Sequence, residues 1–192
     1  MAAGKVITGY SLPYVAIYDP EHDTYSSGMK LGRGVNVQNN INPADDNNFY
    51  ADNVVAEKAK QKFGSGDGTS TIDGLKRDAE RMIYGLPAAD GDGIIDFDDD
   101  MQIPYVGYGY IIRYQEDGVV TFAPMLLCKV MFRLFGDNAA TQEENIDWQT
   151  QELSYDIFRS DNAKHRWKRE GKDETTEAAA EAVLKTMLNI TP

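Results

Sequence analysis

Residues 105–135, YVGYGYIIRYQEDGVVTFAPMLLCKVMFRLF, carry the clearest structural pattern in the chain. Side chains of a strand alternate between its two faces, so every second residue of the first half shares one face: Tyr108, Tyr110, Ile112 and Tyr114. The same spacing in the second half gives Leu126, Cys128, Val130, Phe132 and Leu134. Asp117-Gly118 lies between the halves, and Asp-Gly favours a tight hairpin turn. The stretch therefore predicts two long antiparallel strands.

The segments before this hairpin also favour strands. Residues 12–18 are rich in aromatic and β-branched residues and end at a turn cluster, residues 19–23. Residues 25–36 contain three glycines and predict a short strand, a turn and a second strand. Residues 49–63 mix apolar and charged residues, and their β-rich surroundings favour a strand.

The segments after the hairpin predict two more strands. Apolar residues alternate in one phase over residues 146–150 and in the opposite phase over residues 153–157. One extra residue between the two sets predicts a β-bulge near Gln151 and Glu152. Residues 163–168 are expected to form the last strand.

Two segments have the periodicity of an amphipathic helix. The first follows Asp73 as a potential N-cap and stops at Pro87, and its apolar face consists of Leu75, Ala79, Met82, Ile83 and Leu86. The second spans residues 175–188, with Ala180, Val183, Leu184, Met187 and Leu188 facing inward. Helices that do not alternate with strands argue against a parallel sheet. The chain is therefore expected to be mainly β (α+β) and antiparallel, with one central helix and one C-terminal helix.

Length and composition favour one soluble domain spanning residues 1–192. Apolar residues make up 42% of the chain and charged residues 26%, as in ordinary globular proteins. No run approaches the ~20 apolar residues of a membrane helix, and the first residues do not resemble a secretory signal. The single cysteine, Cys128, excludes an internal disulfide and fits a reducing compartment, so synthesis in the cytoplasm is expected.

The charges are numerous and unevenly distributed. Nineteen Lys and Arg against 31 Asp and Glu give a formal net charge of −12, which argues against a general nucleic-acid-binding protein. Acidic residues concentrate in a loop at 88–101, and six basic residues concentrate in one run: Arg159, Lys164, Arg166, Lys168, Arg169 and Lys172. As a strand, this run would place Lys164, Arg166 and Lys168 on one face. It is either a solvated strand face or a surface that meets the acidic loop of another copy.

The acidic loop partly resembles the calcium-binding loop of an EF-hand. Its oxygen ligands would be Asp90, Asp92, Asp96 and Asp99. However, Ala88 stands at the first ligand position, Asp99 is shorter than the usual bidentate Glu, and Pro87 interrupts the entering helix. A solvated acidic loop is the simpler interpretation, and calcium binding is the alternative.

No pattern indicates a catalytic or cofactor site. The glycine-rich residues 64–68 lack the Gly-Lys-Ser/Thr ending of a phosphate-binding loop and predict a turn before a short strand at 69–72. His22 and His165 stand in no motif with a nucleophile, and Cys128 alternates with apolar residues, which predicts a buried thiol. We therefore expect neither an enzyme nor a cofactor; a hydrolase whose site assembles only in the fold is a further alternative.

Several short segments, in order along nearly the whole chain, resemble the major tail proteins of siphophages. The most extensive is DDNNFYADNVV at residues 45–55. The others are GYSLPYVA at 9–16, IYGLP at 83–87, PYVGYG at 104–109 and DWQTQEL at 147–153, and the helix at 179–190 is similar in character. Their common order carries the resemblance.

This resemblance implies a structural protein of the virion tail that is assembled in the host cytoplasm. Members of the family form hexameric rings that stack into the tail tube, and neighbouring subunits join their sheets into one barrel around a channel. The implied fold is an antiparallel β-sandwich or barrel with a flanking helix. The implied partners are other copies of the chain, the tape-measure protein and other tail proteins. DNA would pass through the lumen without specific binding, and no cofactor or membrane is implied.

Candidate interface residues follow from the resemblance and from composition. A long polar loop is expected at 39–53, where aromatic residues bounded by polar ones suit the core and rim of an interface. The candidates are Asp46, Asn47, Asn48, Phe49, Tyr50, Asp52, Asn53, Arg166 and Lys168. The charge of −12 would keep DNA from adhering to the channel wall. The competing hypothesis is a monomeric calcium- or ligand-binding β-domain that uses residues 90–99.

Overall fold

The fold is built on the predicted hairpin. β7 (Val106–Glu116) and β8 (Val119–Phe132) pair antiparallel across Asp117 and Gly118. Both turn residues have positive φ, 47° and 84°, as a tight hairpin turn requires. The computed structural model describes residues 4–44, 48–51, 54–58, 62–137, 139–141 and 148–190, and for 48–51 and 54–58 it describes the backbone only.

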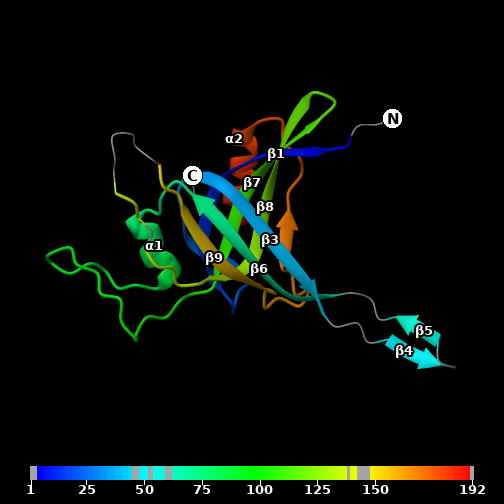
Figure 1. Cartoon of the computed structure of the whole chain (residues 1–192), viewed down its shortest axis with the longest axis horizontal. Helices are drawn as coiled ribbons and strands as arrows, with labels where there is room; N and C mark the ends of the chain where they lie inside the picture. Colours follow the sequence, from blue (N-terminus) through cyan, green and yellow to red (C-terminus); the bar gives the residue numbers. More distant parts are fainter. Residues whose placement is uncertain are drawn as a thin grey trace.

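The hairpin lies at the centre of an antiparallel sheet (Figure 1). The other strands of this sheet are β1 (Val6–Asp19), β2 (Thr24–Lys30), β3 (Gly34–Pro43), β6 (Phe63–Ile72), β9 (Gln151–Phe158) and β10 (Lys168–Glu170). Their order is β2-β1-β7-β8-β9-β6-β3, and β10 pairs with residues 125–127 of β8. β4 (Asn48–Ala51) and β5 (Val54–Lys58) form a separate two-stranded sheet. The expected mainly β, antiparallel class is confirmed.

The sheet curls until its two ends approach one another. β1 and β3 stand near opposite ends of the strand order, yet Tyr10 of β1 packs against Gly34 of β3. A Cβ atom at Gly34 would lie 2.4 Å from the Tyr10 ring, so only glycine leaves room for this contact. The curl encloses an apolar interior.

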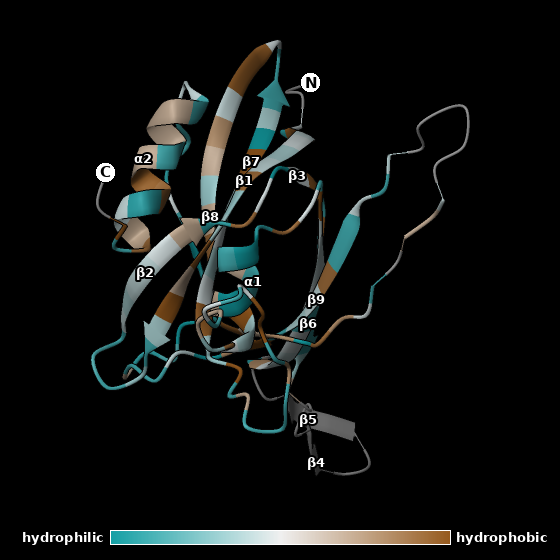
Figure 2. Cartoon of the chain, turned by 90° about the vertical axis from the view of Figure 1, so that its left-hand side faces the viewer, coloured by the Kyte–Doolittle hydropathy of each residue, from teal (hydrophilic) through white to brown (hydrophobic). Residues whose placement is uncertain are grey.

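Two helices cover the sheet over separate apolar clusters. α1 (Arg77–Tyr84) contributes Ala79, Ile83 and Tyr84 to the interior cluster. α2 (Glu177–Met187) packs Ala180 and Leu184 over a second cluster, beside β1, β2 and β8 (Figure 2). Neither described helix is long and apolar enough to cross a membrane.

Strand β8 contributes to both clusters, one from each of its faces, and a β-bulge changes which residues face the interior. Val106 pairs with Val130, but Tyr108 pairs with Leu127, so β8 gains a residue between these two pairs. Leu126 consequently packs in the α2 cluster, whereas Val130 packs in the interior cluster. The prediction that Leu126, Cys128, Val130, Phe132 and Leu134 share one face is therefore wrong, because the bulge separates Leu126 from Val130 and Phe132.

Strands β3 and β6 correct two further predictions. Residues 39–43, expected within the long polar loop, are the end of β3, and residues 64–68, expected as a turn, lie within β6. Asn39 is accommodated because its side chain bonds tyrosine hydroxyls. A Cβ at Gly68 would lie 2.6 Å from the Tyr155 ring, so the glycine makes space beside a neighbouring strand.

Several predicted boundaries also shift. α1 follows Lys76, and Asp73 instead accepts a hydrogen bond from the backbone N–H of Arg33 at 2.6 Å. This contact with Arg33, made by both its side chain and its backbone, lowers the pKa of Asp73. β9 begins at Gln151 and pairs with β6 without a register shift, so the bulge near Gln151 and Glu152 is absent.

The C-terminal helix agrees closely with its prediction at 175–188. The Thr176 side chain caps it by accepting a hydrogen bond from the N–H of Ala179 at 3.2 Å. Ala180, Leu184 and Leu188 are buried, as their spacing indicated.

A hydrogen-bonded network crosses the interior of the sheet. Ser70 of β6 bonds the hydroxyls of Tyr10 (2.9 Å) and Tyr108 (2.7 Å), which bond each other at 2.7 Å. On β3, Asn39 donates to the hydroxyl of Tyr110 at 2.8 Å and accepts from that of Tyr155 at 2.7 Å. These contacts join β1, β3, β6, β7 and β9, and they satisfy polar groups that would otherwise be costly to bury.

Replacing Tyr155→Phe should lower the free energy of unfolding by about 1–3 kcal/mol, because the side-chain oxygen of Asn39 loses its donor in the interior. Urea denaturation measures the effect. Tyr105→Phe is the matched control, since Tyr105 is exposed and its hydroxyl has no partner among the described residues. Equal stability of the two variants would contradict an energetic role for the network.

Stability should also fall at alkaline pH. Burial raises the pKa of Tyr18 to about 12, and it raises that of Tyr155 further. An unfolded tyrosine ionises near pH ~10, so this stabilisation is complete below that pH and is lost as the pH rises through the folded values. Urea denaturation between pH 8 and 11 (roughly spanning the unfolded pKa) should show a steeper loss for the parent than for Tyr18→Phe. Parallel curves would refute this origin.

Candidate functional site

A basic groove lies where the chain passes from β9 to β10. This groove, of about 430 Å³, is lined by Lys62, Phe63, Arg159, Lys164, His165, Arg166, Trp167 and Lys168. The Phe63 and Trp167 rings stack at 5.2 Å between centroids, and the Arg159 guanidinium lies 5.7 Å from the Phe63 ring. The groove therefore combines an aromatic pair with a cationic rim.

The groove exists because residues 159–167 form a tight loop and not the predicted strand. Asn162 accepts the backbone N–H of Lys164 through its side chain (2.9 Å) and that of His165 through its carbonyl (2.9 Å). The N–H of Ser160 then bonds the carbonyl of Arg166 at 2.7 Å. The predicted last strand at 163–168 is thus wrong except at Lys168, where β10 begins. Lys164, Arg166 and Lys168, which were predicted to share one face of a strand, instead line a single groove because of this turn.

Most cations of the groove have no acidic partner. In the part of the chain that the structure describes, no ion pair involves Arg159, Lys164 or Arg166. Lys168 lies 3.7 Å from Glu170, and the nearby Asp161 is bound at 2.6 Å to Lys129. The groove therefore carries uncompensated positive charge on an acidic protein.

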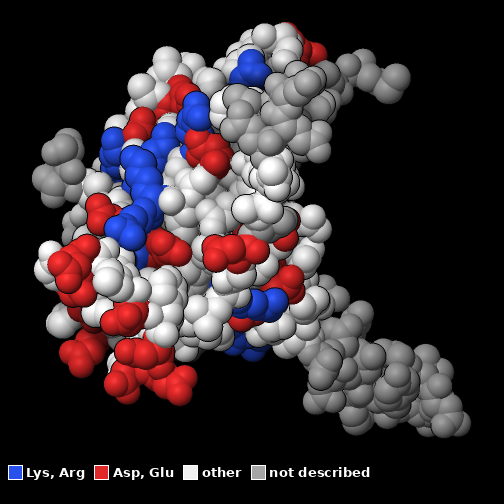
Figure 3. Space-filling view, turned by 60° about the vertical axis from the view of Figure 1, so that its left-hand side comes forward, with Lys and Arg blue, Asp and Glu red and all other residues white. Residues whose placement is uncertain are grey.

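The acidic loop at 88–101 is the opposite kind of surface. Its six aspartates, Asp90, Asp92, Asp96, Asp98, Asp99 and Asp100, are all exposed. In Figure 3, Asp and Glu crowd at the lower end of the molecule, the end at which this loop extends in Figure 1. The loop also exposes Ile94 and Phe97, at 57% and 58%.

The four candidate calcium ligands do not form a cluster in this loop. One carboxylate oxygen of Asp90 accepts the backbone N–H groups of Asp92 (2.9 Å) and Ile94 (2.8 Å). Among the described residues, no three His, Cys, Asp or Glu side chains are grouped so as to hold a metal ion. Asp90 thus shapes the turn around Gly93.

The remaining interface candidates lie in two places, before β6 and in the basic groove. Asp46, Asn47, Asp52 and Asn53 lie outside the described residues. Asn48, Phe49 and Tyr50 lie in β4, whose backbone pairs with β5, and the predicted loop at 39–53 is therefore partly strand. Arg166 and Lys168 both line the basic groove.

The outer edges of the main sheet are open. β3 and β2 end the strand order, and neither has a hydrogen-bonded neighbour on its outer side among the described strands. β3 is ten residues long, and Gln38, Asn40 and Asn42 are exposed along it. A long unpaired edge is a template for another strand.

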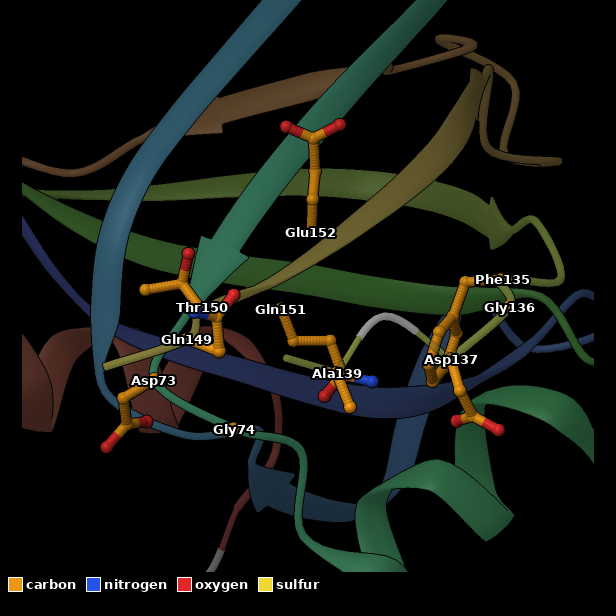
Figure 4. A pocket seen from close by; sticks show the side chains of 10 residues that line it. All are labelled: Asp73, Gly74, Phe135, Gly136, Asp137, Ala139, Gln149, Thr150, Gln151 and Glu152. Atoms are coloured by element: carbon orange, nitrogen blue, oxygen red, sulfur yellow. The ribbon is translucent and has the colours of Figure 1, made fainter. Parts of the chain in front are cut away.

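A second hollow, beside α1, lacks the geometry of a catalytic site (Figure 4). It has a volume of about 460 Å³, and three carboxylates line it, from Asp73, Asp137 and Glu152. In Figure 4 they do not point toward one another, and Asp73 is already bonded to Arg33. Gln151 likewise accepts the backbone N–H of Leu75 at 2.9 Å. The polar groups therefore stabilise local structure, and the described carboxylates here form no acid–base pair.

The sequence missed part of these surfaces. Phe63 and Lys62 belong to the groove, but they are far in sequence from the basic run, and only the pairing of β6 with β9 brings them there. Phe97 could be found from the sequence, since it is an aromatic residue within an aspartate run.

Comparison with known proteins does not assign a family: no family model matches the chain, and no curated protein matches it. The likeness to siphophage major tail proteins rests on the short segments described above. It therefore stays a prediction.

Cys128 should be unreactive in the folded protein. Burial raises the pKa of its thiol to about 11, and the N–H of Cys128 bonds the carbonyl of Trp167 at 2.9 Å beneath the groove. Because the thiolate is the reactive form, labelling by a thiol reagent at neutral pH should be slower by about a hundredfold than in urea. Fast labelling of the native chain would contradict this burial.

Proposed function

We propose that the chain is the major tail protein of a siphophage, a structural subunit that polymerises into stacked rings. The rings, six subunits each in the family it resembles, form the tail tube through which DNA reaches the host. The subunit carries out no reaction and holds no cofactor. Its main partners are copies of itself, together with the tape-measure protein and other tail proteins.

One observation carries the proposal: a curled antiparallel sheet ends in a ten-residue strand, β3, and no other described strand pairs with its outer edge. Natural proteins usually shorten, charge or cover such edges, because they promote pairing between chains. Pairing the edges of neighbouring copies around a ring satisfies the free backbone groups and closes a barrel. The order of the tail-protein-like segments supports the same function.

Exposed apolar residues support contact between rings. Val6, Ile7 and Val119 are exposed together, because the start of β1 pairs with the end of β7 beside the hairpin turn. Their place at one extremity of the sheet suits the contact between stacked subunits, where apolar area would be buried.

Negative-stain microscopy of the purified chain at high concentration, with mass by light scattering, tests the proposal directly. Rings or tubes with a central hole are the expected result. A strict monomer, even when mixed with preformed tail tips or tail tubes as nuclei, would overturn it.

The double variant Gln38→Lys with Asn42→Lys should assemble at least about tenfold more weakly than the parent, because lysines along an edge oppose strand pairing. The dependence of mass on concentration measures the effect. Ala178→Lys with Ala182→Lys adds the same charge on the exposed side of α2 and should leave assembly unchanged. Equal melting temperatures would show that folding is retained; unchanged assembly of the edge variant would exclude β3 from the contact.

A further inference from the structure

We infer that the acidic loop at 88–101 of one copy docks into the basic groove of the next, an inference that rests on the self-assembly proposed above. The occupant of the groove is thus a second copy of this chain. This contact between side chains would add to the backbone hydrogen bonds formed between the sheet edges of neighbouring copies.

The charges of the two surfaces are complementary and locally unbalanced. The loop contains six aspartates and no base. The groove is lined by five Lys and Arg and by no acidic residue. Opposed patches of this kind orient partners and speed their association.

The apolar parts of the two surfaces also correspond. Phe97 and Ile94 project from the loop between aspartates. The stacked Phe63–Trp167 pair gives the groove an aromatic wall between its cations. A neighbouring hollow of about 620 Å³, lined in part by Phe63 and Phe158, extends this apolar surface. Insertion of Phe97 would bury an aromatic anchor inside a charged rim, the usual anatomy of an interface.

One copy does not fill its own groove. The loop is bound to α1, where Arg77 donates to the carbonyl of Gly93 (3.4 Å) and Arg81 to that of Pro87 (2.9 Å). In Figure 1 the loop extends to the left of the lower end, whereas β6 begins on the right, with Phe63 as its first residue. Two different surfaces on opposite sides of one subunit make a heterologous contact, which closes into a ring or extends as a filament.

Cross-linking of full-length variants tests the contact. Asp96→Cys and a tagged Lys164→Cys protein are mixed and treated with a short bismaleimide, to which buried Cys128 is unreactive. The mixed dimer should exceed, by at least about tenfold, that formed when Ala182→Cys replaces Lys164→Cys, because only the first pair lies in a specific contact. Equal yields would overturn the inference.

Charge reversal gives a second, independent test. Lys164→Glu with Arg166→Glu impairs only the groove, and Asp96→Lys with Asp98→Lys impairs only the loop, so each protein alone should associate about tenfold more weakly. Mixed, they offer two complementary contacts, because the unaltered loop of the first meets the unaltered groove of the second, and the basic loop of the second meets the acidic groove of the first. Mass photometry should therefore show stronger assembly of the mixture than of either variant alone. Variants that assemble like the parent, or a mixture that assembles no better than its components, would refute docking.

The two proposals fail in different ways. Tubes with no specific cross-link would overturn the docking contact and leave the tail-tube function intact. A specific cross-link without rings or tubes under any of the conditions above would support docking and overturn the tail-tube function.

Discussion

The enclosed interior of the curled sheet depends on two small polar side chains, Ser70 and Asn39. Their side chains form hydrogen bonds with the hydroxyls of tyrosines from three other strands. The large tyrosine rings can therefore fill the interior without leaving a buried hydroxyl unpaired. This arrangement holds β1 against β3 and β6 although β1 pairs with neither. The curl in turn places α1 over the interior cluster and leaves β3 at an edge that no other described strand pairs with. The enclosed interior and the open edge, on which the proposed association rests, therefore have one physical origin.

Periodicity predicted much of this fold, and it failed where an inward position was polar or glycine. The central hairpin and the strand in residues 12–18 are rich in aromatic and β-branched residues, and the C-terminal helix has apolar residues at helical spacing, so these elements were predicted correctly. β3 and the first half of β6 were not, because Asn39 points inward and the glycines stand where tyrosines need room. The bulge in β8 was equally hidden, since both of its faces are apolar there.

The sequence predicted the candidate surfaces only in part, because it shows local patterns and not long-range contacts. Runs of like charge are local in sequence, so the basic run and the acidic loop could be predicted as surfaces. The depth of the groove could not, because it needs Phe63 from β6 beside Trp167, and that neighbourhood is created by long-range strand pairing. The turn at Asn162, which gathers the cations, looked like part of a strand because its residues alternate.

The bulge in β8 also sets rules for how this gene can change in length. Before the bulge, one set of β8 side chains faces the interior; after it, the opposite set does. Deleting one codon of β8 before the bulge would turn the rest of the strand inside out, exchanging Phe132 for Arg133 in the interior, whereas deleting one codon at the bulge itself would only make the strand regular. Residues 88–101 face no such restriction from strand register, because that loop lies outside the described strands. Changes of length should therefore be rarer within β8, away from its bulge, than in the loop.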